Sequence, residues 1–228
     1  MRAVVMGGTS GIGLATAEQL TKSGFEVTVT GRDPGRLAAA AERFAGAERI
    51  DGTDRDAVSA FFAGYGEFEH LVLAFSPGAV GAGPLRDIGI EDFEAAFTGK
   101  LFAYVHAIRQ ARVTGSITMI SAASARAAVP GVAALAAVNG AIERMVSPLA
   151  AELAPVRVNA VSPGVVDTPW WDFLPADARQ AQFDAMVAGL PATRVATAGD
   201  VADAVVYLVG AGVVTGAILP VDGGFTVA

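Results

Sequence analysis

Cysteine is absent from the 228-residue chain, and side chains that exchange protons near neutral pH are few. Without a thiol, the chain has no disulfide framework, thiolate metal site or cysteine nucleophile. It contains two histidines, three tyrosines and two lysines, Lys22 and Lys100, against fourteen arginines. Any proton transfer must therefore draw on a short list of residues.

Charge is also sparse. Charged residues make up 17% of the chain and hydrophobic residues 53%, a composition too apolar for a disordered protein. The net charge of −7 argues against a nucleic-acid partner. A length of 228 residues predicts a single domain over 1–228 whose core needs no metal or disulfide staple. We expect no metal site.

Long hydrophobic runs are missing as well. The apolar residues of the N-terminal segment pass at once into a glycine-rich turn and are too few for the core of a signal peptide. The longest uncharged stretch, from about Ala127 to Ala141, is interrupted by Pro130 and Gly131. It is too short to cross about 30 Å of hydrocarbon. We therefore expect a cytoplasmic protein with no membrane partner.

Short β-branched segments alternate with alanine-rich amphipathic segments along the chain. This alternation predicts an α/β fold of the Rossmann type: a doubly wound parallel sheet of about seven strands with helices on both faces. Several expected strands are apolar throughout, as strands covered on both faces must be. Strands are predicted at Ala3–Met6, Glu26–Thr30, Glu48–Ile50, His70–Ala74, Ser116–Ser121, Arg157–Val161 and Ala217–Pro220, and helices at Ile12–Lys22, Pro34–Phe44, Arg55–Ala63, Glu91–Arg109, Val132–Glu152 and Asp200–Val209. The irregular segment from Asp167 to Thr197 is expected to be an insertion with one or two helices.

A glycine-rich turn follows the first expected strand and leads into a helix. Glycines allow backbone N–H groups to approach a pyrophosphate, and the helix N-terminus adds a favourable dipole. The place of this turn at the first strand–helix junction favours dinucleotide binding over a turn that is merely rich in glycine. The predicted contacts are Gly7, Thr9, Ser10, Gly11, Ile12 and Gly13.

Arg32 ends the second expected strand, about 20 residues after the glycine turn, where dinucleotide-binding folds place the residue that contacts the adenosine ribose. An acidic residue there favours NAD, whereas an arginine offers planar donors and a positive charge that suit a 2′-phosphate. We therefore predict NADP(H). Asp33 and Pro34 form an N-cap signal, so Arg32 can also be a solvated residue that opens the next helix.

Four motifs, in this order, resemble the short-chain dehydrogenase/reductase family, and the resemblance covers nearly all of the chain. They are Gly7-x-x-x-Gly11-Ile12-Gly13, Asp51-Gly52-Thr53-Asp54, Arg157-Val158-Asn159-Ala160-Val161-Ser162-Pro163-Gly164 and Val221-Asp222-Gly223-Gly224. The fourth-strand motif is changed, because Leu73-Ala74-Phe75-Ser76 replaces the family's Asn-Asn-Ala-Gly. The resemblance implies further cofactor contacts at Asp51, Gly52, Ala74, Pro163, Gly164, Val165 and Thr168.

The expected active site departs from the family pattern. Members usually carry a serine after the fifth strand, a tyrosine thirteen residues later, a lysine four residues further, and an asparagine on the preceding helix. The corresponding positions here hold Ala122, Leu135 and Asn139, and our alignment places Lys100 at the asparagine position. Alanine and leucine side chains donate no proton. The other register, with Ser121 as the serine, places Ala134 at the tyrosine position. The resemblance thus predicts an atypical member in which lysine and asparagine have exchanged places.

Lys100, Ser121 and Asn139 are the predicted catalytic residues. A lysine that faces an apolar cleft can have its pKa lowered toward neutrality and act as a general acid. Asn139 is expected to hold the cofactor ribose, and Ser121 or Ser124 to bond a substrate oxygen. In the alternative interpretation of Lys100, its side chain extends to solvent or binds a helix end. In the alternative interpretation of the serines, their hydroxyls bond local backbone groups. Tyr104 shares a helix face with Lys100, but packing is the commoner role of such an aromatic.

Residues 168–197 match the family's substrate lid. Its aromatic and methionine side chains, Trp170 and Trp171 among them, suit a small apolar or ring-containing substrate, although they can equally pack the lid on the body. We predict an NADP(H)-dependent reductase that acts on a carbonyl, imine or activated alkene. The alternative is an NADP(H)-binding protein without redox turnover: a sensor, a non-catalytic subunit, or a cyclase or isomerase. The family resemblance also implies a homo-oligomer, a tetramer or dimer.

Overall fold

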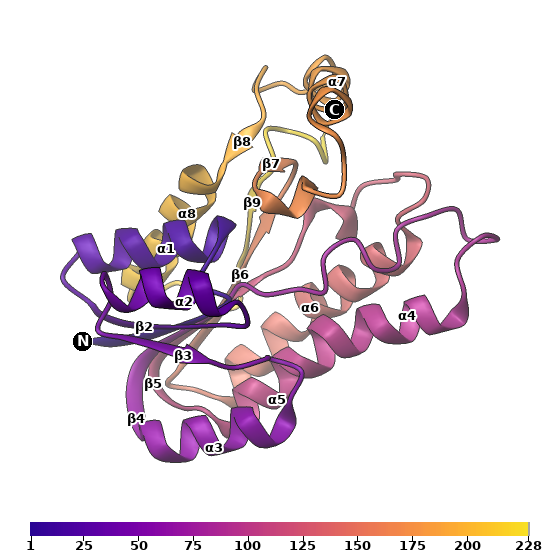
Figure 1. The fold of residues 1–228 in the computed structure, drawn as a ribbon. Coiled ribbons are helices and arrows are strands. Elements are labelled where there is room, and N and C mark those ends of the chain that lie inside the picture. The colour runs from indigo at the N-terminus through magenta and orange to yellow at the C-terminus, as the bar shows by residue number, and fades with distance from the viewer. Residues whose placement is uncertain (228) are drawn as a thin grey trace.

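The β-branched segments form one parallel sheet in the computed structural model, which describes residues 1–227 (Figure 1). Within these residues the sheet has seven strands in the order β3-β2-β1-β4-β5-β6-β9, which confirms the predicted doubly wound α/β fold. The strands are β1 (Arg2–Met6), β2 (Glu26–Gly31), β3 (Gly46–Arg49), β4 (Glu67–Leu73), β5 (Arg112–Ile120), β6 (Arg157–Pro163) and β9 (Ile218–Val221).

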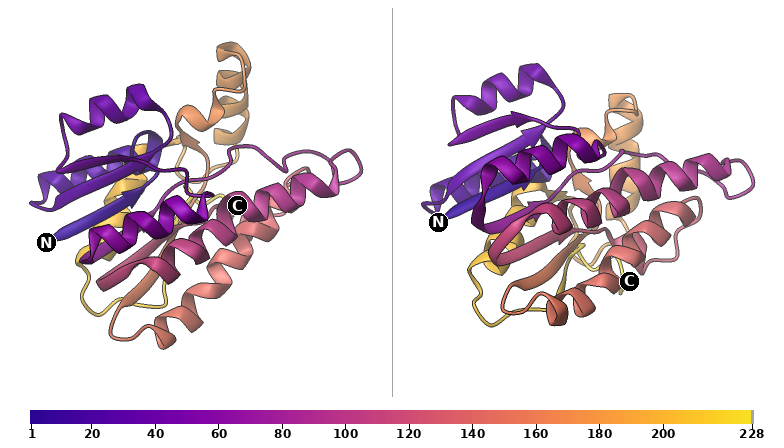
Figure 2. Two further views of the ribbon diagram at one scale, coloured as in Figure 1. Left: turned by 60° about the horizontal axis from the view of Figure 1, so that its bottom comes forward. Right: turned by 90° about the horizontal axis from the view of Figure 1, so that it is seen from below.

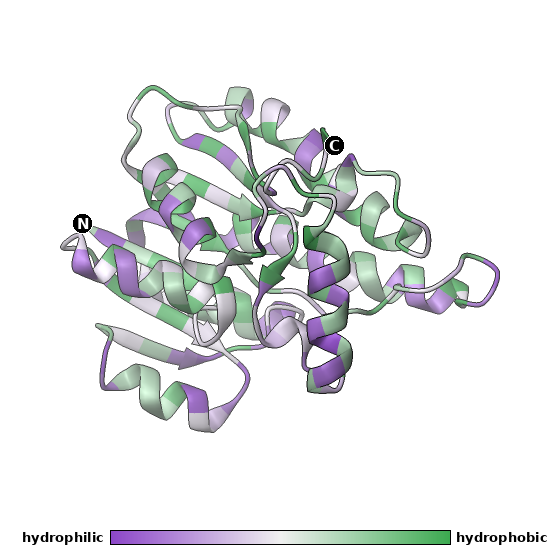
Figure 3. Cartoon of the chain, turned by 90° about the horizontal axis from the view of Figure 1, so that it is seen from above, coloured by the Kyte–Doolittle hydropathy of each residue, from purple (hydrophilic) through white to green (hydrophobic). Residues whose placement is uncertain are grey.

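Helices cover both faces of this sheet (Figure 2). One face carries α1 (Gly11–Lys22), α2 (Pro34–Ala41) and α8 (Ala198–Gly210), and the other carries α3 (Arg55–Tyr65), α4 (Ile90–Ala96), α5 (Ala103–Gln110) and α6 (Ala133–Glu152). Strand β1 shows why the central strands contain consecutive apolar residues. Its Val4 and Met6 are buried in one core and its Ala3 and Val5 in the other. The apolar strands form the centre of the molecule in Figure 3.

The strand order reverses between β1 and β4. From β1 the chain moves outward through β2 to β3, and then returns to place β4 on the other side of β1. Consecutive crossovers therefore lead to opposite sides at this point, and a crevice opens at the carboxyl ends of the two strands. Cofactor crevices of doubly wound folds lie at such a switch point.

Several strand and helix boundaries in the structure differ from the predicted ones. The third strand was predicted at Glu48–Ile50 but runs from Gly46 to Arg49, because it follows the register that pairs Thr28 of β2 with Gly46. The helix predicted to end at Phe44 ends at Ala41 instead. Strands β4 and β5 begin earlier than predicted, because their pairing starts at Glu67 and Arg112, where charged residues interrupt the hydrophobic pattern.

The helix predicted over Glu91–Arg109 is interrupted. A π-helical turn, Phe97–Phe102, separates α4 from α5. Gly99 allows this turn to pass close to the loop after β4, because a Cβ at that position would lie 2.8 Å from the Pro77 side chain. A π-helical turn places an extra residue in the helix and is frequent at functional sites. Lys100 lies within it.

The segment between β6 and α8 forms the predicted insertion. Its ends pair as two short parallel strands, β7 (Val166–Asp167) and β8 (Ala196–Thr197). Between them lie a 3₁₀ turn, Pro169–Trp171, and helix α7 (Ala176–Val187), which projects beyond the sheet (Figure 1). Among residues 1–227, no helix has the length and apolarity that a membrane span requires.

Candidate active site

A cavity of about 640 Å³ opens at the switch point of the sheet. Its lining comes from the turn after β1, the loops that follow β2 to β6, the π-helical turn, α6 and the insertion. Nearly all of the predicted site residues line it, namely Gly7, Thr9, Ser10, Gly11, Ile12, Arg32, Asp51, Gly52, Ala74, Lys100, Ser121, Asn139, Pro163, Gly164, Val165 and Thr168. The fold therefore brings together residues that are spread over more than 160 positions of the sequence.

Gly13 is the exception among the predicted cofactor contacts, because it does not line this cavity. A Cβ at Gly13 would lie 2.1 Å from the Gly7 carbonyl oxygen, so this glycine packs the helix against the turn. Gly7 lies in the turn itself, with a φ of +82° that favours glycine, and a Cβ there would lie 2.9 Å from the Ala74 backbone. Both positions need glycine for close backbone packing.

The turn leads into the N-terminus of α1, which begins at Gly11. The N-cap residue Ser10 makes no side-chain capping hydrogen bond, so the first-turn amides remain for another acceptor. Ser10, Gly11 and Ile12 all line the cavity. An anionic group such as a pyrophosphate fits this cradle, because the amides and the helix dipole favour negative charge there.

Arg32 lies at the far end of the cavity, beside the carboxylate of Asp51. Its Nη1 is 3.9 Å from Asp51 Oδ2, and its side chain is 67% exposed. Burial raises the pKa of Asp51, but hydrogen bonds from the Thr53 backbone and hydroxyl, together with the Arg32 charge, hold it below its ordinary value. Arg36 of α2 lines the same end. Two guanidinium groups therefore lie where a phosphate can reach them.

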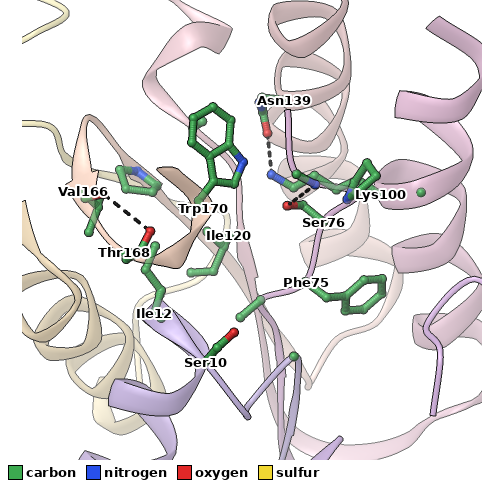
Figure 4. A pocket seen from close by; sticks show the side chains of 18 of the residues that line it. Ser10, Ile12, Phe75, Ser76, Lys100, Ile120, Asn139, Val166, Thr168 and Trp170 are labelled. Atoms are coloured by element: carbon green, nitrogen blue, oxygen red, sulfur yellow. Dashed lines mark hydrogen bonds between the residues drawn. The ribbon is translucent and has the colours of Figure 1, made fainter. Parts of the chain in front are cut away.

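Lys100 is buried at the other end of the cavity, with 8% of its surface exposed. Its Nζ donates to Asn139 Oδ1 at 2.7 Å (Figure 4). It also donates to the Ser121 carbonyl oxygen at 3.4 Å. Within residues 1–227, no carboxylate forms an ion pair with this amine. Burial alone lowers the pKa of Lys100 to about 7. The amine is thus positioned and close to half-protonated at neutral pH.

Asn139 of α6 has its amide fully engaged. While its Oδ1 accepts from Lys100, its Nδ2 donates to the Leu135 carbonyl at 2.9 Å and to Ser124 Oγ at 3.2 Å. Both amide hydrogens are therefore used within the protein. The sequence suggested that Asn139 holds the cofactor ribose, but the structure shows an amide that holds Lys100.

Ser121 presents its carbonyl, not its hydroxyl, to Lys100. The hydroxyl donates toward Glu143 Oε1 at 2.9 Å and the Val161 carbonyl at 3.3 Å. Glu143 is itself paired with Arg126, at 3.3 Å between Oε2 and Nε. The expectation of a Ser121 hydroxyl that bonds a substrate oxygen is therefore not supported by this geometry, which directs the group toward α6.

Several residues that line the same cavity as Lys100 are apolar. They include Ala122 and Leu135, which the sequence motifs predicted at the positions of the family's serine and tyrosine, and Trp170 of the 3₁₀ turn. The Tyr104 hydroxyl does not replace the missing groups. It donates to the Phe75 carbonyl at 3.0 Å, and burial raises the pKa of Tyr104 well above its ordinary value.

Sequence reasoning did not assign a role to Ser76, which also lines the cavity. Its hydroxyl accepts a hydrogen bond from the Gly78 amide at 3.3 Å. The sequence did contain an indication that Ser76 is part of the site, because Ser76 lies in the altered motif after the fourth strand. Only the tertiary structure shows that this loop and the π-helical turn line one cavity.

Arg179 of α7 ties this helix to the first residues of the insertion. This side chain pairs with Asp167 and with Asp172, the latter at 3.3 Å, and donates to the Thr168 carbonyl at 3.2 Å. The tryptophans Trp170 and Trp171 pack edge to face, with ring centroids 4.8 Å apart, and both line the cavity. The two tryptophans therefore form an aromatic part of the cavity wall.

Comparison with known proteins agrees with this fold. A sequence model of the enoyl-(acyl carrier protein) reductase family matches residues 7–226. Cis-4-hydroxycyclohexanecarboxylate dehydrogenase of Sinomonas cyclohexanicum is 35% identical and covers 98% of this chain and 96% of its own length. The 3-oxoacyl-[acyl-carrier-protein] reductase MabA of Mycobacterium tuberculosis is 33% identical and covers 97% of this chain and 91% of its own.

Two solved structures extend the comparison. A small-chain dehydrogenase in complex with NADPH superposes with a TM-score of 0.87 at 33% identity, covering 100% of this chain and 99% of that one. The MalC reductase/Diels-Alderase of Malbranchea aurantiaca superposes with a TM-score of 0.89 at 25% identity, covering 99% and 95%. The chain belongs to the short-chain dehydrogenase/reductase family, whose members are oxidoreductases that use a nicotinamide cofactor.

Proposed function

We propose that this protein is an NADP(H)-dependent reductase in which the Lys100 ammonium takes the place of the family's proton-donating hydroxyls. The observation that carries the proposal is the buried Lys100 amine, held 2.7 Å from Asn139 in the cavity that the glycine turn also lines. When bound, the nicotinamide cofactor supplies hydride from its C4 carbon. The protein must bind and orient the cofactor and the substrate, and it must supply a proton to the substrate.

Cofactor binding falls to the residues at the switch point. The α1 amides would hold the pyrophosphate, and Arg32 with Arg36 would hold the 2′-phosphate. Asp51 and Gly52 would contact the adenine, and the segment after β6 up to Thr168 the nicotinamide end. The structural likeness to a dehydrogenase bound to NADPH supports the choice of NADP(H) over NAD.

Proton transfer falls to the Lys100 amine. Two of its N–H groups are directed to Asn139 Oδ1 and the Ser121 carbonyl, so the third N–H of the ammonium remains for a substrate oxygen. Burial destabilises the charged form, and giving up the proton relieves that cost. A donor with a pKa of about 7 suits general-acid catalysis near neutral pH.

The substrate class follows from the walls around Lys100. Leu135, Trp170 and Met186 line the cavity and favour a small apolar or ring-containing carbonyl, imine or activated alkene. A relative named for a hydroxycyclohexanecarboxylate supports a ring substrate. We propose that residues 168–197 act as the lid over it. The homo-oligomer stays a prediction, which the half-exposed Phe102 supports.

The test is NADPH oxidation with a panel of cyclic ketones, diketones, quinones and cyclic imines. Lys100→Met is expected to lower turnover by about 10²- to 10⁴-fold, the usual contribution of a positioned acid, with NADPH affinity retained in fluorescence titration. Lys22→Met, which changes the chain's other lysine at an exposed position of α1, is the matched control. Turnover that survives in Lys100→Met would contradict the assignment.

A second function is favoured by the missing hydroxyls. With Ala122 and Leu135 at the positions of the family's serine and tyrosine, the cavity can instead shape a ring-forming reaction while NADP(H) is bound. The likeness to a reductase/Diels-Alderase supports this alternative. Tight NADPH binding without oxidation on any substrate of the panel would favour it over the reductase.

A further inference from the structure

We propose that Lys100 is also a nucleophile that forms a reversible imine with an aldehyde or ketone held in the cavity. The inference rests on the proposed function only in placing Lys100 at the substrate end of the cavity. It needs no hydride transfer, so the two proposals can fail separately.

The hydrogen bonds of Lys100 match a neutral amine. Its Nζ has two acceptors, Asn139 Oδ1 and the Ser121 carbonyl, and a neutral amine has two N–H groups to donate. Within residues 1–227, the structure shows no third acceptor for an ammonium. A buried N–H without a partner is costly, more so when the group is charged, so burial shifts the amine toward its neutral form.

The remaining tetrahedral position of Nζ is the one that reacts. In the neutral amine it holds the lone pair, because the side-chain carbon and the two donated N–H groups occupy the other three positions. Lys100 lines the cavity, so this position is reached from the cavity side. The same position carries the third N–H when the amine is protonated. Lys100 therefore presents an acid at low pH and a nucleophile at higher pH, in one geometry.

Desolvation supports the nucleophile. The pKa of about 7 leaves roughly half of the Lys100 amines neutral at pH 7, whereas an unperturbed lysine with a pKa of about 10.4 leaves fewer than about one in a thousand. The apolar residues Ala122, Leu135 and Trp170, which line the same cavity, disfavour water, which would otherwise hydrolyse an imine. The chain has no cysteine to compete for the carbonyl compound.

The reaction balances without a redox partner. The Lys100 lone pair attacks the carbonyl carbon, the C=O π electrons move to oxygen, and one amine proton is transferred to that oxygen to give a neutral carbinolamine. The hydroxyl group then leaves with the remaining N–H proton as water, and the nitrogen electron pair forms the C=N bond. One water is released and nothing is oxidised or reduced. Protonation of the imine leaves one N–H, for which Asn139 Oδ1 is the nearer acceptor.

The test uses the full chain with benzaldehyde and sodium cyanoborohydride, which reduces an imine to a stable benzylamine, and no NADPH. Peptide mapping by mass spectrometry then compares Lys100, Lys22 and the N-terminal amine within the same sample. We expect labelling at Lys100 to exceed that at exposed Lys22 by about tenfold or more near pH 7. It should rise with pH and level off above the pKa of Lys100.

Variants and cofactor turnover separate the outcomes. Lys22→Arg should retain the Lys100 adduct, and Lys100→Arg should lose it. Equal labelling of Lys100 and Lys22 in the wild-type chain would overturn the proposal, and this comparison holds even if Lys100→Arg does not fold. An adduct at Lys100 without NADPH oxidation on the substrate panel would leave the imine standing while the reductase fails. NADPH oxidation without an adduct at Lys100 would reject the imine and leave the reductase standing.

Discussion

The contact between Lys100 and Asn139 predicts how the pH dependence of the enzyme responds to substitution of Asn139. Oδ1 of this residue lies 2.7 Å from the Lys100 amine, and the amine has no carboxylate partner within residues 1–227. Asn139→Asp places a negative charge at that distance with little change in shape. An opposite charge favours the protonated amine, so the pKa of Lys100 rises. Asn139→Ala removes the acceptor and lowers it.

The magnitudes follow from the contact. An opposite charge within about 4–6 Å shifts a pKa by about 1–3 units, which moves that of Lys100 from about 7 to about 8–10 in Asn139→Asp. Asn139→Ala removes a hydrogen bond to a charged group, which is worth about 1.5–3 kcal/mol. This loss lowers the pKa of Lys100 by about one to two. In Asn139→Asp the second carboxylate oxygen would face the Leu135 carbonyl, which now accepts from Nδ2 at 2.9 Å. This contact costs stability without changing the sign of the shift.

The assay is kcat for NADPH oxidation as a function of pH. If protonated Lys100 is the acid, the wild-type kcat falls above about pH 7. The fall should begin at higher pH in Asn139→Asp and at lower pH in Asn139→Ala. Thermal melting at each pH controls for unfolding. Three profiles that fall at the same pH would refute Lys100 as the titrating group.

Three further predictions follow from other contacts. Arg32→Ala should weaken NADPH binding by about 10- to 100-fold, the loss of a charge-assisted hydrogen bond, and leave NADH binding unchanged; equal losses for both cofactors in fluorescence titration would disprove the 2′-phosphate contact. The pKa of Lys100 is about 7 in the folded chain and 10.5 in the unfolded chain. Between about pH 7 and 10.5 the unfolded chain therefore binds more protons than the folded chain. The free energy of unfolding should rise with pH across that window, by up to about 5 kcal/mol from this group. Denaturant unfolding should show that rise in the wild-type chain and lose this component in Lys100→Met. Gly13→Ala should destabilise the chain by about 1–3 kcal/mol, because its Cβ would meet the Gly7 carbonyl at 2.1 Å; a variant that melts at the wild-type temperature would show that the turn relaxes freely.

The parts of this site that lie within one strand–turn–helix unit were readable from the sequence. The glycine turn was placed correctly because its requirement is local: only glycine permits the close approach at Gly7 and Gly13. The order of apolar strands and amphipathic helices likewise determined the doubly wound fold. The positions of Ala122 and Leu135, which line the cavity as the motif spacing implied, also followed from the pattern.

The direction of each polar group was decided only by tertiary packing. Lys100 and Asn139 are 39 positions apart, and their 2.7 Å contact depends on how the π-helical turn meets α6. The hydroxyl of Ser121 bonds Glu143 rather than facing the cavity because a buried carboxylate lies on that side. Hydrophobic periodicity records which face of an element is buried, but it contains no information on the partner that a polar side chain finds across the fold. The sequence by itself therefore determined the fold, and it predicted the cofactor contacts and an active site without the usual hydroxyls. The structure decided that the lysine amine is held by an amide and a carbonyl at the cavity.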